Sequence, residues 1–104
     1  MTEAERRYEL NSLLQDILGS NFVYFQPPEN LKLHFPCIIY ELSGKDILHA
    51  DNAKYRKMRK YTVTVVDKDP DSEIPLRLEE LPLCSFDRVY AADNIYHSVY
   101  TLYF

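Results

Sequence analysis

The sequence predicts an α+β fold: a mostly antiparallel sheet of four to five strands with two helices on one face. Three observations favour this class. The chain opens with a helical stripe of leucine and isoleucine, continues with short runs rich in β-branched and aromatic residues, and contains a second, shorter helical segment between those runs. The expected order is α-β-β-β-α-β-β within a single domain, residues 1–104, which is long enough to bury a modest core.

The first helix is predicted by its capping residues and its apolar stripe. Thr2 and Glu5 stand at the spacing of a capping box. Five apolar residues recur at helical spacing: Leu10, Leu13, Leu14, Ile17 and Leu18. Gly19 follows them and can adopt the left-handed conformation that ends a helix. We therefore expect a surface helix whose apolar side lies on a sheet.

Three strand candidates follow, at residues 22–25, 37–42 and 61–66. The first ends before consecutive prolines, Pro27 and Pro28, which force an extended loop. The second and third are rich in β-branched residues, as strands usually are. Residues 43–54 between them are polar and are predicted to form a long hairpin loop. Hairpin loops usually have about two to five residues, so a longer one tends to be functional or disordered.

The remaining residues predict a short helix and a closing hairpin. Pro75 stands in the first turn of a helical segment at residues 72–81, and Pro82 stands just past its end. Two strands, at residues 85–90 and 95–104, then pair around a turn. This hairpin completes the predicted sheet.

The last strand carries apolar or aromatic residues on both of its alternating faces. One set is Ile95, Val99 and Tyr103, and the other is Tyr96, Tyr100, Leu102 and Phe104. A strand of this kind needs a cover on each side. The two helices cover one face of the sheet, and we expect the other to be an exposed apolar interface between subunits. Tyr96 and Tyr100 are the candidate contacts, although surface tyrosines can also simply display their hydroxyls to water.

A basic patch leads into the third strand. It comprises five of the twelve Lys and Arg residues: Lys54, Arg56, Lys57, Arg59 and Lys60. Subtracting these five charges from the net charge of −4 leaves −9 for the rest of the chain. Tight autonomous binding of double-stranded DNA is not expected, because such binding needs a broad basic face. The patch is therefore either a local contact surface or the solvated base of a hairpin.

The residue types that carry catalysis are present but scattered. The three histidines, His34, His49 and His97, belong to separate predicted elements. Two glycines in the whole chain leave no Gly-rich phosphate loop. Cys37 and Cys84 lie far apart, and we interpret both as reduced core thiols. We predict that the chain is not an enzyme and has no catalytic residue and no cofactor. A catalytic site assembled from residues far apart in the sequence stays open, because such a site is recognised by its geometry.

The acidic run at residues 67–73 has the spacing that begins a calcium loop, D-x-D-x-D-x-E. Ser72 stands where that loop needs glycine, and Leu78 stands where it needs a bidentate glutamate. Acids before a helix are favoured by the helix dipole. We therefore interpret the run as a capped turn that leads into a helix, and we predict no metal site.

The sequence shows no targeting or membrane segment. No apolar run approaches the roughly 18 residues of a membrane span. The start is acidic and polar, where a signal peptide would be basic and then apolar. We expect a protein that works where it is made, without contact to a membrane.

Three stretches in the second half of the chain form a recognisable pattern. They are residues 55–75, with Y-R-K before Y-T-V-T-V-V-D-K-D-P-D-S-E-I-P, residues 81–88, L-P-L-C-S-F-D-R, and residues 90–94, Y-A-A-D-N, followed by the terminal strand. Together with the element order, these stretches resemble the tail terminator (tail completion) proteins of phages with long, non-contractile tails. Residues 21–42 fit this resemblance less specifically.

The resemblance implies a structural protein of the virion. Proteins of this family form a ring, generally of six subunits, that caps the tail tube and offers a surface to the head connector. The implied partners are other copies of this chain, the tail tube protein and a head connector or stopper protein, with DNA only in transit through the channel. The implied location is the head–tail junction, after assembly in the host cytoplasm.

Within such a ring the basic patch would face either the channel or the adjoining subunit. Subunit pairing is favoured, because DNA that slides through a channel gains nothing from strong phosphate contacts. Two alternative functions stay open. One is a head–tail connector or stopper protein of the same neck region, and the other is a small nucleic-acid-binding module that uses residues 54–60.

Overall fold

The computed structural model describes residues 2–49 and 55–104, with only the backbone described at residues 3, 46–49 and 55–57. The elements are α1 (Glu3–Leu18), β1 (Val23–Phe25), β2 (Cys37–His49), β3 (Tyr55–Asp67), α2 (Ile74–Glu79), β4 (Cys84–Ala92) and β5 (Ile95–Tyr103). This order and the α+β class confirm the prediction. Neither helix of the described chain is long and apolar enough to span a membrane.

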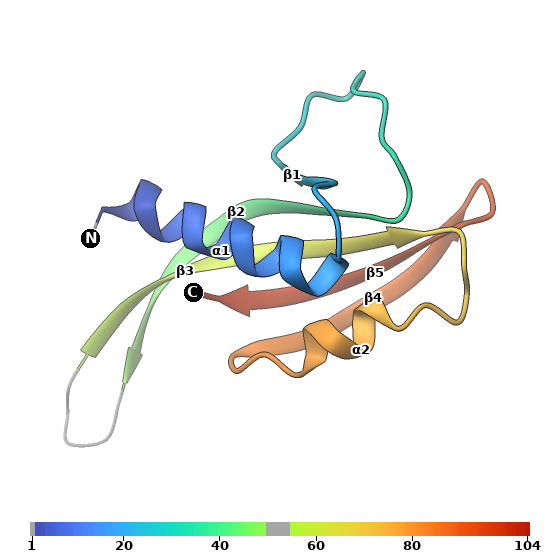
Figure 1. Cartoon of the computed structure of the whole chain (residues 1–104). Coiled ribbons are helices and arrows are strands. Elements are labelled where there is room, and N and C mark those ends of the chain that lie inside the picture. Colours follow the sequence, from blue (N-terminus) through green and yellow to red (C-terminus); the bar gives the residue numbers. More distant parts are fainter. Residues whose placement is uncertain (1, 50–54) are drawn as a thin grey trace.

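The five strands form one sheet in the order β1-β2-β3-β5-β4. β1 pairs with β2 in parallel, and every other pairing is antiparallel. Figure 1 shows α1 and α2 lying along the same side of this sheet. The outer strands are therefore β1 and β4, while β3 and β5 lie in the interior of the sheet.

α1 forms where its local signals predict it. The Thr2 hydroxyl oxygen accepts a hydrogen bond from the Glu5 backbone N–H at 3.1 Å. At the other end Gly19 has a φ of 84°, and its N–H donates to the Gln15 carbonyl. Both ends thus satisfy backbone groups that a helix leaves unpaired.

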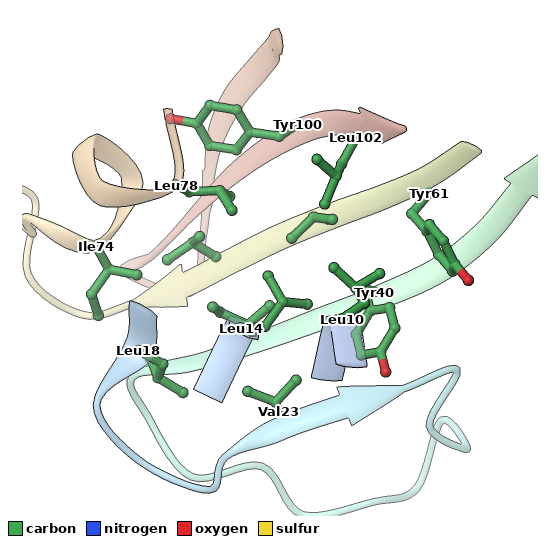
Figure 2. Packing of buried hydrophobic residues seen from close by; sticks show 13 residues of the cluster. Leu10, Leu14, Leu18, Val23, Tyr40, Tyr61, Ile74, Leu78, Tyr100 and Leu102 are labelled. Carbon is green, nitrogen blue, oxygen red and sulfur yellow. The ribbon is translucent and has the colours of Figure 1, made fainter. Parts of the chain in front are cut away.

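The hydrophobic core lies between the two helices and the sheet (Figure 2). Its members are Leu10, Leu14, Leu18, Val23, Ile38, Tyr40, Tyr61, Val63, Val65, Ile74, Leu78, Tyr100 and Leu102. The Tyr40 hydroxyl donates to the Asn11 side-chain oxygen at 2.7 Å, so this buried ring keeps a partner for its polar end. The described residues therefore bury a core on the helix-covered face without help from another molecule.

Both cysteines are free thiols, as expected. Cys37 is buried and Cys84 is half-buried against the core. Burial raises the pKa of each thiol to about 11. The thiols are therefore protonated and unreactive near neutral pH.

The predicted loop at residues 43–54 is wrong over residues 43–49. These residues continue β2, which pairs with β3 from Gly44 opposite Lys60 to His49 opposite Tyr55, after a bulge that follows Leu42. Ser43, Gly44, Lys45 and Asp46 favour a loop by their composition, but backbone pairing with β3 makes this segment a strand. The other residues of that predicted loop, 50–54, lie outside the described residues.

Candidate functional site: a basic ribbon and two apolar edges

The β2–β3 hairpin extends beyond the rest of the sheet. β5 pairs with β3 only as far as Lys60, so residues 55–59 of β3 pair only with residues 45–49 of β2. We call these two segments the basic ribbon. In Figure 1 it projects past the C-terminus, on the side where α1 begins. A two-stranded hairpin alone is only marginally stable in water, and no third strand of the described chain pairs with the basic ribbon.

The base of the basic ribbon is tied to the start of α1. The Phe104 N–H donates to the Arg59 carbonyl at 3.0 Å, and the Arg6 side chain donates to the Phe104 carbonyl at 3.0 Å. The Arg59 guanidinium lies 5.6 Å from the centre of the Tyr61 ring. Its Nε is buried without a hydrogen-bond partner among the described residues. An unpaired buried donor is costly, so this position lowers the stability of the ribbon's base.

The basic patch predicted from the sequence is placed in part. Arg59 and Lys60 are half-buried at the base of the basic ribbon. Arg56 and Lys57 belong to β3, but their side chains lie outside the description, as does all of Lys54. The Arg6 side chain and the Arg59 backbone both bond to Phe104, and Arg6 was not among the residues predicted for this patch.

Tyr100 is a core residue, so its prediction as a subunit contact is wrong. The side chain is 1% exposed, and the edge of the Phe86 ring packs on it at 5.6 Å between centres. Its hydroxyl lies 3.5 Å from the Pro75 carbonyl, and burial raises the tyrosine pKa. Tyr100 is buried because the even-numbered residues of β5 face the helices. Tyr96 is half-buried opposite Asp67 of β3, and its subunit contact stays a prediction.

The face opposite the helices, which we call the open face, is not the apolar surface that the sequence predicted. Its half-buried or exposed residues are of two kinds. Polar residues include Glu41, Thr62, Thr64, His97 and Thr101, and apolar or aromatic residues include Ile39, Tyr90, Ile95 and Tyr103. Cys37, Val66 and Val99 are buried there. Threonine-rich faces are common where an antiparallel sheet meets water. The face is therefore mixed, and its use as a subunit interface stays a prediction.

Exposed large hydrophobic side chains gather instead at the edges of the sheet. The set that we call the β4 patch follows this edge on both faces of the sheet: Leu76 in α2, Leu83 just before β4, Phe86 and Val89 on the helix-covered face, and Tyr90 on the open face. A smaller pair, Phe22 and Leu31, lies beside β1, at the opposite edge. The apolar residues were visible in the sequence, but a bulge between Phe86 and Arg88 shifts the alternation of β4. Exposed apolar groups of this kind mark interaction surfaces.

A hollow lies beside β1, on the open face of β2. Its lining includes Pro28, Leu31, Leu33 and Ile39, with Glu29 and Glu41 as its charged residues. The loop that connects β1 to β2 forms one wall of this hollow, and the alternate residues of β2 form the other. The hollow thus combines apolar walls with two carboxylates.

The acidic run after β3 forms capped turns. The Asp67 carboxylate accepts the Asp69 N–H at 3.1 Å, and the Asp69 carboxylate accepts the Asp71 N–H at 2.9 Å. These carboxylates therefore have a structural role in the turn before α2. Among residues 2–49 and 55–104, no group of histidine, cysteine or acidic side chains could hold a metal ion.

No protein-family model matches the sequence, and no curated protein matches it. The candidate site consequently rests on geometry and charge. Its parts are the basic ribbon at one end of the molecule, the β4 patch at one edge, and the hollow beside β1 at the other edge.

Proposed function

We propose that this chain is a phage tail terminator: a structural subunit that forms a ring, ends the growth of the tail tube and joins the tail to the head connector. We infer this assembly, generally a six-membered ring, from the sequence resemblance described above. The observation that supports assembly most directly is the basic ribbon, which leaves the sheet without a third strand in the described chain.

The length of the basic ribbon supports the proposal of a partner. Five paired residues on each strand extend for about 16 Å beyond the end of β5, at roughly 3.3 Å per residue. Over that length no third strand of the described residues pairs with the ribbon, and the Phe104 N–H donates to the Arg59 carbonyl at its base. A second molecule that packs on the ribbon would supply the stabilisation that a lone hairpin lacks.

The charge of the chain favours a second copy as that molecule. Residues 54–60 carry five positive charges, whereas the rest of the chain carries −9. Exposed acids, Glu5 and Glu9, lie in the first half of α1, the same region that Arg6 connects to the base of the ribbon. A neighbouring copy in a ring would therefore present acids at the level of the ribbon. Complementary charges of this kind steer association and fix its register.

The deciding experiment removes the protein from phage assembly. Particles that lack it should carry tails of irregular length that do not join heads, and a copy supplied in trans should restore both properties. Electron micrographs of the two preparations give tail length and the fraction of joined particles. Tails of normal length that are joined to heads in its absence would reject the terminator role.

A further inference from the structure

We propose that the subunits join edge to edge, with the β4 edge of one copy seated in the hollow beside β1 of the next copy. The inference rests on the proposed ring and adds which surfaces meet and which charges pair. β1 and β4 are the two outer strands, so the meeting surfaces lie at opposite edges of the sheet. Both include residues of the open face, where Tyr90 also lines a second hollow with Ile39 and Glu41 of its own chain. Contacts between unlike surfaces run head to tail, and they close into a ring when the rotation between copies allows it.

The β4 edge has the composition of an interface. Every residue of β4 after Cys84 is exposed. Phe86 and Val89 leave 54% and 57% of their surfaces exposed, and Tyr90 leaves 45% although it stacks on His97. Aromatic side chains that are held in place yet half uncovered are typical anchors of protein interfaces. A partner would bury the exposed half of each ring.

Arg88 supplies the charge of this edge. Its side chain is 63% exposed and pairs with Asp87 at 2.8 Å. An exposed pair of this kind contributes little to stability, so the guanidinium can exchange its partner at small cost. The register places Arg88 opposite Val99 and Tyr90 opposite His97, and these positions lie on the open face.

The hollow offers the complementary charges on the same face. Glu29 and Glu41 are its charged lining residues, and both are exposed. The hollow also has an apolar wall that includes Leu31 and Ile39. This wall fits the ring of Tyr90, which lies near Arg88 on β4. We therefore assign Arg88 of one copy to the two carboxylates of the next, and Tyr90 to the apolar wall.

A charge exchange tests whether these two surfaces meet, and the mass of the assembled species then distinguishes a head-to-tail ring from a two-fold dimer. One variant is Arg88→Glu, and the other is the double variant Glu29→Lys with Glu41→Lys. Each variant alone places like charges across every interface, so ring formation should weaken by about a hundredfold or more. An equimolar mixture restores opposite charges at every interface of an alternating ring, so the mixture should assemble like the unaltered chain. Lys68→Glu is the control, since it makes the same charge change outside the hollow and β4.

Light scattering measures the mass of the assembly in solution. Assembly on the tail is measured by co-expressing the variants in infected cells and counting the particles whose tails are joined to heads. Circular dichroism checks that each exposed substitution leaves the fold intact. Rescue in the mixture but not in the single variants supports the interface. Unaltered assembly of the Arg88→Glu variant, or failure of the mixture to recover in both assays, overturns it. Rings that follow the charge exchange while tails keep normal length without the protein would reject the terminator role and leave the interface standing.

Discussion

Replacing Tyr100 by alanine separates the core from the interface more sharply than any other single change. Tyr100 is 1% exposed and fills the space between Val63 of β3, Phe86 of β4 and the first turn of α2. Truncation of a fully buried aromatic ring costs about 3–5 kcal/mol, through lost burial and the cavity left behind. We expect the Tyr100→Ala variant to lose this much unfolding free energy, or to fail to fold.

Two matched variants divide that loss into parts. The Tyr100 hydroxyl lies 3.5 Å from the Pro75 carbonyl, which is long for a hydrogen bond, so Tyr100→Phe should cost at most about 1 kcal/mol. Phe86 touches the same ring but is 54% exposed, so Phe86→Ala should cost about 1–2 kcal/mol. The order of losses should therefore be Tyr100→Ala, then Phe86→Ala, then Tyr100→Phe.

Urea unfolding followed by far-ultraviolet circular dichroism gives these free energies. The chain contains no tryptophan, so fluorescence would report only on tyrosines. Measurements on dilute, monomeric protein keep association out of the result. An unfolding free energy of Tyr100→Ala within about 1 kcal/mol of the unaltered chain would refute the core assignment, especially if that variant also failed to assemble.

Three further outcomes follow from single features of the structure. Gly19→Ala should lose about 1 kcal/mol of unfolding free energy in urea, because φ is 84° there, whereas the exposed Ser12→Ala on α1 should lose none. Burial raises the pKa of the Cys37 thiol from 9.0 to about 11. The protonated thiol therefore contributes to stability fully below pH 9, and this contribution is lost as the pH rises through 11. Urea unfolding at alkaline pH should show a smaller loss of stability for Cys37→Ala than for the unaltered chain, and equal losses would contradict this. The double variant Arg59→Glu, Lys60→Glu should assemble less, and its assembly should depend less on salt, as measured by light scattering. If instead the unaltered chain binds DNA tightly in a salt-sensitive way and the double variant does not, a nucleic-acid-binding module is favoured.

The sequence predicted the elements that local interactions define. α1 follows from a hydroxyl cap at Thr2, a glycine stop at Gly19 and an apolar stripe, all of which act within a few residues. The order of the strands along the chain follows from β-branched runs separated by turn residues. These signals need no knowledge of the tertiary structure, and the structure confirms them.

Features that depend on distant contacts were missed. Residues 43–49 form a strand whose partner is β3, although their polar composition favours a loop. β5 has apolar residues on both alternating faces, so the pattern could not tell that Tyr100 faces α2 while Val99 faces away. The bulge after Phe86 changes the face of each later residue in β4, and nothing in the sequence marks its position.

The mass of the assembled species tests the central claim most directly. Native mass spectrometry over a range of concentrations, alone and with tail tube protein, should show one closed species near 74 kDa, six times the 12.3 kDa chain, with few intermediates. A two-fold dimer as the largest species, or a monomer under every condition, would contradict association through unlike edges.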